Sequence, residues 1–330
     1  MSTSGIHHVS AIAGNAQQNV DFYAGVVGLR LVKKTVNFDD PSAYHLYYGD
    51  ERGSPGSLIT FFPYPRSRTG RAGVGQVAQV SFTIPDGAIG FWLHRFVTYG
   101  VDHDVPARRF GQATLAFRDR DGLQLELVST NAVDDSHPWT SRDIAAQHAI
   151  RGVHGVTLWE NALEPTEKIL TAGLGFVRGA TEDATTRFSV SDGGPTRFVD
   201  VRVVGGFLPP QGGAGTVHHV AFRAADDASE LATRSAMSDL GLSPTPVIDR
   251  EYFHSVYFRE PGGVLFELAT DEPGFTVDEP LDRLGAGLML PPQYEPSRVA
   301  IEAKLPSLHA PFTAPLASPD GGSSTAPHTN

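Results

Sequence analysis

Fourfold internal repetition is the feature that most restricts how this chain can fold. Four short apolar segments carry His8, Gln79, Gly155 and His219 at the same register, at intervals of 64 to 76 residues. A helix-like stretch follows each of these segments. A repeat of this length indicates equivalent supersecondary units that bury their apolar faces against one another.

The first unit shows what each repeat contains. Apolar residues recur at helical spacing between Asn15, a candidate N-cap, and Gly28, a candidate C-terminal glycine, which predicts a helix over 15–28. Short segments rich in β-branched and aromatic residues surround it and are typical of strands. The unit is therefore predicted to be βαβββ, with strands at 6–14, 29–38, 43–49 and 58–65.

The later units follow the same plan. Units two and four end alike, in DGLQLELVST and GGVLFELATD, so that Glu126 and Glu267 follow Gln79 and His219 by 47 and 48 residues. The predicted helices of units two to four cover 87–100, 161–175 and 226–241.

These units predict an α+β protein with open, barrel-like sheets. We expect one domain from units one and two (1–145) and another from units three and four with an extension (146–304), which includes a short helix over 296–304. The remainder, 305–330, is rich in Pro, Ser, Thr and Gly and is expected to be disordered.

Composition excludes several classes of function. The formal net charge is −11 and no run of Lys or Arg occurs, which argues against nucleic acid or an anionic membrane as the main partner. Because the chain has no Cys, metal ligands must come from His, Asp and Glu. No apolar stretch is long enough to span a membrane and no export signal is visible, so we expect a cytoplasmic protein, with a homo-oligomer left open.

Two histidine pairs stand out among the 13 His residues. His7-His8 and His218-His219 occur at the same register of units one and four. Neighbouring strand residues point to opposite faces, so one His of each pair can face a cavity while the other supports it. Two imidazoles and a carboxylate suit a metal site with open coordination positions.

The carboxylate depends on how the units pair. Glu267 lies within an apolar strand, where an unpaired charge would be costly, and Glu126 raises the same question. If units one and four pair, one cavity collects His8, His219 and Glu267. If units one and two pair, His8 instead meets Gln79 and Glu126. Completeness of the ligand set favours the first arrangement.

A family resemblance rests on the stretch from Val256 to Glu267, VYFREPGGVLFE. It is similar to the signature of extradiol ring-cleaving dioxygenases, and the four βαβββ units resemble the vicinal oxygen chelate fold. The histidine that the signature expects upstream of Tyr257 is replaced by Arg250, and His254 is out of register. The Arg and the two His pairs resemble the hydroquinone 1,2-dioxygenase branch over about residues 5–304.

This resemblance implies an Fe(II)-dependent ring-cleaving dioxygenase, with Mn(II) as a second option for the metal. Its substrates would be O2 and a hydroquinone or related dihydroxylated aromatic. Arg250 would offset negative charge, and Tyr257 or His218 would transfer protons. The implied metal ligands are His8, His219 and Glu267, and the implied supporting residues are His7, Ser10, His218, Arg250 and Tyr257.

Other interpretations stay open at this point. Tyr257 could be a packed strand aromatic, and Arg250 could form a surface ion pair with Asp249 or Glu251. A glyoxalase-like isomerase or lyase would add a second carboxylate ligand, but the last strand of unit one, around Thr60, has none. A drug-binding resistance protein on the same fold would generally lack the ligands altogether.

Overall fold

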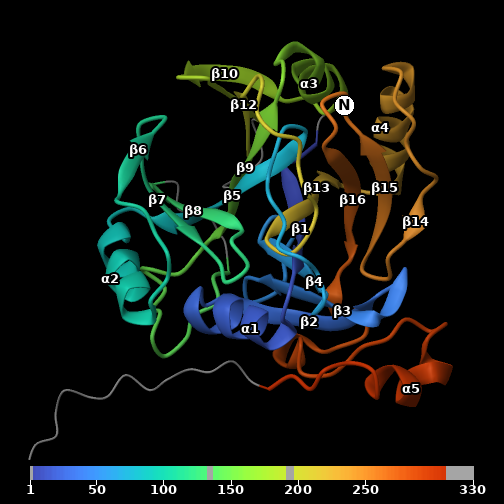
Figure 1. Ribbon diagram of the computed structural model, residues 1–330. Coiled ribbons are helices and arrows are strands. Elements are labelled where there is room, and N and C mark those ends of the chain that lie inside the picture. The colour runs from blue at the N-terminus through green and yellow to red at the C-terminus, as the bar shows by residue number, and fades with distance from the viewer. Residues whose placement is uncertain (1–2, 132–136, 191–196, 310–330) are drawn as a thin grey trace, which may run out of the picture.

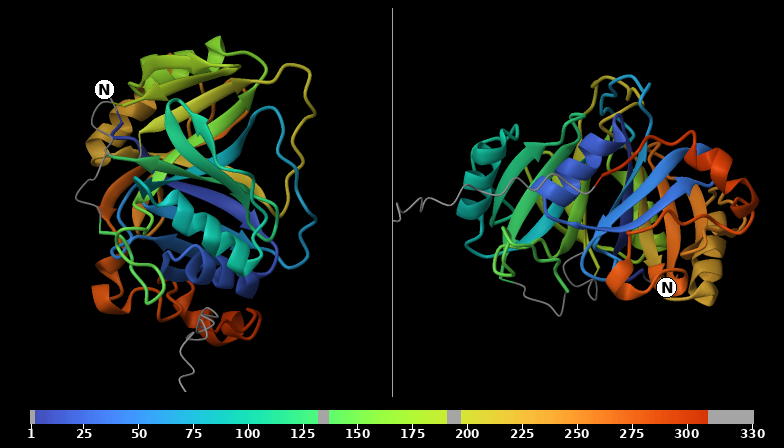
Figure 2. Two further views of the ribbon diagram at one scale, coloured as in Figure 1. Left: turned by 90° about the vertical axis from the view of Figure 1, so that its left-hand side faces the viewer. Right: turned by 90° about the horizontal axis from the view of Figure 1, so that it is seen from below.

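The fold consists of two curved eight-stranded sheets lying side by side (Figures 1 and 2). The computed structural model describes residues 3–131, 137–190 and 197–309. The α+β class and the barrel-like sheets of βαβββ units are confirmed. Short, β-branched strands of this kind curl because each strand carries a right-handed twist.

One sheet combines the first and last units of the chain. Its inner strands β1 (Ile6–Ala13) and β13 (Thr216–Ala224) pair antiparallel. In order, its strands are β14 (Ile248–Asp249), β15 (Phe253–Arg259), β16 (Leu265–Pro273), β13, β1, β4 (Leu58–Pro63), β3 (Asp40–Gly49) and β2 (Arg30–Asn37).

The other sheet combines the two middle units in the same way. Its inner strands β5 (Gln76–Pro85) and β9 (Gly152–Glu160) also pair antiparallel. In order, its strands are β10 (Val177–Glu182), β11 (Thr185–Ser189), β12 (Phe198–Val203), β9, β5, β8 (Gln124–Thr130), β7 (Gln112–Arg118) and β6 (Ala107–Arg109).

This pairing decides between the two arrangements that the sequence allowed. Units one and four share a sheet, as completeness of the ligand set favoured. The contiguous ranges 1–145 and 146–304 therefore do not coincide with the two sheets. Each range contributes one unit to each sheet because the first strands pair with a unit from the opposite half of the chain. The seam between β1 and β13 joins residues 211 positions apart.

Helices cover the outer faces of the sheets (Figure 2). Asn15 caps the first helix, accepting a hydrogen bond from the Gln18 amide, and Asp226 forms a capping box with Ser229. The predicted helices of units one and three are short α-helices that continue as π-helices. The helices are α1 (Ala16–Val20) with η1 (Asp21–Val26), α2 (Ile89–Tyr99), α3 (Glu164–Lys168) with η2 (Ile169–Gly173), and α4 (Asp227–Asp239).

The C-terminal extension packs along the first sheet. Lys33 is completely buried and lies 2.5 Å from carboxylate oxygens of both Asp278 and Glu279, which ties the extension to β2. The expected short helix is present. The extension contains η3 (Phe275–Val277), η4 (Leu281–Arg283), η5 (Glu295–Ser297) and α5 (Arg298–Glu302).

The boundary of the expected tail needs a correction. Leu305 is buried and Leu308 packs against the core, so the ordered chain extends past residue 305. The rest of the predicted tail, 310–330, lies outside the described residues. In the part of the chain that the structure covers, no helix has the length and apolar character needed to cross a membrane.

Candidate metal centre

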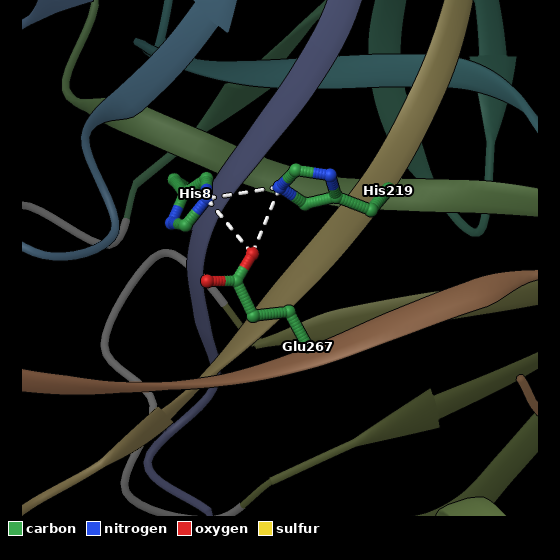
Figure 3. Close-up of side chains that lie close together, drawn as sticks. All are labelled: His8, His219 and Glu267. Atoms are coloured by element: carbon green, nitrogen blue, oxygen red, sulfur yellow. Dashed lines mark hydrogen bonds and ion pairs between the residues drawn. The ribbon is translucent and has the colours of Figure 1, made fainter. Parts of the chain in front are cut away.

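Three side chains predicted as metal ligands converge on the inner seam of the first sheet (Figure 3). The Nε2 atoms of His8 and His219 lie 3.3 Å apart, and Glu267 Oε2 lies 3.3 Å from the first and 2.8 Å from the second. The three come from β1, β13 and β16. All three are buried, and they form the one such group found among the described residues. The predicted convergence is confirmed.

Local strand geometry aims these side chains inward. The ladder between β1 and β13 shifts register between Ile6 and His8 and again between Ser10 and Ala11. Register shifts of this kind re-aim side chains and are frequent beside active sites. On the neighbouring strand, Glu267 lies opposite Ala221, two residues after His219, which brings its carboxylate to the two imidazoles.

The charges in this cluster suit a divalent cation. Burial alone raises the pKa of Glu267, but the adjacent His8 and His219 outweigh it and hold the pKa well below its usual range. Burial lowers the pKa of His219, which favours the neutral imidazole that metals require. Glu267 Oε2 is buried and lacks a properly aligned hydrogen-bond donor. A cation between the three groups would satisfy this oxygen, so the residues present fit a metal ion.

The first histidine of each pair, His7 or His218, supports the second instead of joining the cluster. His7 Nδ1 lies 2.9 Å from His8 Nδ1, and His218 Nδ1 lies 2.7 Å from His219 Nδ1. These contacts use the ring nitrogen that does not face Glu267. They hold the orientation of each ligand ring, and when the ligand ring donates its Nδ1–H in this contact its Nε2 is left unprotonated. Burial lowers the pKa of His218 to about 4 and that of His7 well below its usual value.

A cavity of about 360 Å³ opens in front of the cluster. This volume lies within the range of small-molecule sites. Aromatic side chains dominate its wall, with a few polar groups among them. Its lining includes His8, His219, His218, Asn37, Phe38, Asp39, His45, Tyr47, Phe62, Tyr64, Arg250, Phe253 and Tyr257.

Arg250 and Tyr257 meet in this cavity. The Arg250 guanidinium carbon lies 5.4 Å from the centre of the Tyr257 ring, and Nη1 lies 3.3 Å from Asp39 Oδ2. The ion-pair partner is thus Asp39, from the loop between β2 and β3, rather than Asp249 or Glu251. Burial opposes the charge of Arg250, but Tyr257 and Asp39 raise its pKa, and burial raises the pKa of Tyr257. Arg250 stays a cation at the cavity wall.

Ser10 and His254 occupy places outside the metal cluster. Ser10 Oγ lies 2.7 Å from Thr60 Oγ1, and Thr60 stands where a fourth, carboxylate ligand would be expected. His254 contacts Asp227 on α4 at 2.6 Å. His254 is out of register in the signature, and its side chain accordingly lies away from the cavity.

Sequence reasoning missed three residues of this site. Ser255 Oγ donates a hydrogen bond to Glu267 Oε1 at 2.6 Å, and His45 and Tyr47 form part of the cavity wall. Comparison of the third strands of units one and four would have found them. In both strands a polar residue precedes a tyrosine by two positions, His45–Tyr47 and Ser255–Tyr257, so that both members share a face.

The second sheet carries a different set of charges at the equivalent place. Glu126 accepts hydrogen bonds from Ser81 and from Arg109, at 2.8 and 2.7 Å, and Asp200 pairs with Arg187 through both carboxylate oxygens at 2.8 Å. Gln79 lines a separate cavity of about 200 Å³ beside Arg109. Gln79 and Glu126 are therefore separate from the histidine cluster, as predicted.

Comparison with known proteins identifies the family. The family described as Glyoxalase/Bleomycin resistance protein/Dioxygenase superfamily matches residues 5–127. MhqO of Bacillus subtilis strain 168, whose name describes a ring-cleaving dioxygenase, is 45% identical over 307 residues, 92% of this chain and 96% of MhqO. The chain belongs to this superfamily. It is a ring-cleaving dioxygenase, and the metal-dependent chemistry of the superfamily agrees with the His/Glu cluster.

Two further relatives refine the comparison. The chlorohydroquinone/hydroquinone 1,2-dioxygenase of Sphingobium indicum is 34% identical and covers 88% of this chain and 92% of its own length. A solved dioxygenase structure from Bacillus subtilis is 44% identical, with a TM-score of 0.90 over 94% of this chain and 98% of that chain. Glyoxalase I from Zea mays, at 17% identity and a TM-score of 0.59 over 81% of this chain and 92% of its own, shares the fold alone.

Proposed function

We propose that His8, His219 and Glu267 bind Fe(II), with Mn(II) as the alternative, and that the enzyme uses O2 to cleave a hydroquinone or related dihydroxylated ring. The observation that carries the proposal is the convergence of two buried imidazoles and the unsatisfied Glu267 Oε2 beside an aromatic cavity. A relative named for chlorohydroquinone and hydroquinone supports the substrate class. Two His and one carboxylate form the ligand set typical of non-haem Fe(II) oxygenases.

The metal, when bound, would supply Lewis acidity toward a ring hydroxyl and a path for electrons from the ring, which is oxidised, to O2, which is reduced. The protein's own side chains supply the other requirements of the reaction. The cluster is buried and the cavity wall is largely aromatic, so a bound ring would displace water and strengthen electrostatic interactions inside the cavity. Arg250, held between Asp39 and the Tyr257 ring, places a permanent positive charge where negative charge develops.

In this proposal, Tyr257 and His218 transfer protons. Tyr257 lies beside Arg250 and has its ring centre 5.7 Å from that of His219. His218 lines the cavity and contacts His219. Either can hold or pass a proton at its hydroxyl or ring nitrogen while a substrate is bound.

The position of Thr60 weighs against a glyoxalase-like reaction. Thr60 pairs with Ser10 on β1 as Glu267 pairs with Ala221 on β13, so Thr60 occupies the symmetry-related place of the carboxylate ligand. Thr60 offers a hydroxyl in place of a carboxylate, and this hydroxyl is hydrogen-bonded to Ser10 and His45. This side of the site is therefore left open to an incoming ligand.

Metal analysis and oxygen uptake test this function. Protein purified without oxygen should contain about one iron per chain and consume O2 on addition of hydroquinone. Glu267→Gln should lose the metal while remaining folded. Glu126→Gln, at the related place in the second sheet, is the matched control and should keep its metal content. Equal metal in wild type and Glu267→Gln, or no oxygen uptake by the iron-loaded wild type, would contradict the proposal.

Two broader expectations accompany this function. A cytoplasmic location stays a prediction from the sequence, and a homo-oligomer stays an open alternative. Cell fractionation and sedimentation in solution would test them.

A further inference from the structure

The metal-bearing sheet has an internal symmetry that places a second polar group opposite Glu267. On β15 and β16, Tyr257 pairs with Glu267, and on β3 and β4, Tyr47 pairs with Thr60. His45, two residues before Tyr47, is therefore the counterpart of Ser255. Ser255 bonds Glu267 at 2.6 Å and His45 Nε2 lies 2.9 Å from Thr60 Oγ1, so the symmetry extends to the hydrogen bonds.

Both ring nitrogens of His45 are engaged. In addition to the contact with Thr60, His45 Nδ1 lies 2.8 Å from the Tyr47 hydroxyl. The imidazole is also held by its neighbours on each side, with ring centres 4.0 Å from Tyr47 and 4.1 Å from Phe62. Thr60 continues the chain of hydrogen bonds to Ser10 at 2.7 Å. His45 is thus fixed in position and orientation before any ligand arrives.

The chemistry of imidazole couples the two hydroxyls that it contacts. Burial lowers the pKa of His45 well below its usual value, so the ring is neutral and carries one N–H. It can donate to only one of Tyr47 and Thr60 and must accept from the other. The Tyr47 oxygen keeps the capacity for at least one further hydrogen bond, and Tyr47 lines the same cavity as the metal ligands.

We propose that Tyr47 is a specificity-determining residue that hydrogen-bonds the second hydroxyl of a dihydroxylated ring, and that His45 is the positioning residue that holds the Tyr47 hydroxyl for it. The inference rests on the proposed function and adds the group that recognises the hydroxyl away from the metal. The geometry agrees with this role. The metal cluster lies on β1, β13 and β16, and Tyr47 lies on β3, at the other side of the curved sheet.

Anaerobic binding to the iron-loaded protein tests the inference without turnover. Hydroquinone and phenol differ only in the second hydroxyl, so the ratio of their dissociation constants isolates its recognition. One hydrogen bond is worth about 1 kcal/mol, so wild type should bind hydroquinone about five- to tenfold more tightly than phenol. Tyr47→Phe should bring this ratio close to one, because the ring remains and only the hydroxyl is lost.

Three further variants separate positioning from simple packing. His45→Leu should also reduce the ratio, because the Tyr47 hydroxyl loses its partner. His45→Gln should restore most of it, since an amide can donate to one hydroxyl and accept from the other. Tyr48→Phe is the matched control. Tyr48 neighbours Tyr47 on β3, but its hydroxyl bonds Asn19 away from the cavity, so the ratio should stay at the wild-type value.

The outcomes distinguish this inference from the proposed function. Absence of oxygen uptake by wild type would count against the proposed function. An unchanged ratio in Tyr47→Phe, or a wild-type ratio near one, would overturn the role of Tyr47 even in an active dioxygenase. If His45→Leu fails to fold, His45→Ala takes its place in this comparison. A wild-type ratio in the leucine or alanine variant would reject positioning through the imidazole.

Discussion

Removal of the Ser255 hydroxyl tests how far the metal site depends on the residues behind its ligands. Ser255 is fully buried and donates a hydrogen bond of 2.6 Å to Glu267 Oε1, the oxygen that does not face the histidines. A hydrogen bond to a charged group contributes about 1.5–3 kcal/mol. In Ser255→Ala the carboxylate loses this donor and can rotate away from His8 and His219. We therefore expect metal affinity to fall by about 10- to 100-fold, which is the usual effect of such supporting residues.

The assay is a competition titration of Fe(II) or Mn(II) against a chelator of known affinity, without oxygen. Ser255→Thr keeps the hydroxyl on a strand position that accepts β-branched residues, so it should retain most of the affinity. Circular dichroism should show the same fold for both variants. Equal affinity in wild type and Ser255→Ala would refute the reasoning, because the hydrogen bond would then contribute nothing to ligand orientation.

Three other predictions concern stability. Lys33→Met leaves Asp278 and Glu279 without their buried cation and should lower the free energy of unfolding by about 3–5 kcal/mol in urea titrations. Burial and the nearby Glu260 raise the pKa of Glu160 to about 8, so the folded state keeps a proton that the unfolded state loses above pH 4.5. Stability should fall as pH rises from about 4.5 to 8, and Glu160→Gln should flatten this dependence. Deletion of 310–330 should change neither the melting temperature nor oxygen uptake, given its composition.

The sequence was sufficient to predict the units and the convergence of the three candidate ligands because both depend on register within a repeat. His8 and His219 occupy the same position in the first strands of units one and four. Because side chains alternate between the two faces of a strand, equivalent positions point to the same face of the sheet. Once units one and four pair, the position of Glu267 in the last strand follows. The repeat could not show which units share a sheet, since each first strand can pair with any other.

The cavity wall was harder to predict because it comes from elements that meet only in the folded chain. Arg250 has Asp39 as its partner, 211 residues earlier in the sequence, where the neighbouring Asp249 and Glu251 were the obvious candidates. The sequence marks His45 and Tyr47 only through the two-residue spacing that they share with Ser255 and Tyr257. Their importance follows from the pairing of β3 with β4 and from the contact of Thr60 with both Ser10 and His45.

The two sheets together explain why the described part of the chain has one candidate metal centre rather than two. In each of the four units, the last strand pairs with the first strand through an equivalent residue. These residues are Thr60, Glu126, Asp200 and Glu267.

In the second sheet, Gln79 and Gly155 replace the histidines, and without a cation the two buried carboxylates, Glu126 and Asp200, would repel each other. Arg109 and Arg187 offset that charge, so the ion pairs there perform the electrostatic task that the proposed metal would perform in the first sheet. In the first sheet, Thr60 replaces one carboxylate, which leaves a single carboxylate, two imidazoles and room for a ligand. The same fold thus yields a closed ion-pair network in one sheet and an open site in the other, and the residues at the equivalent positions of the first and last strands decide which.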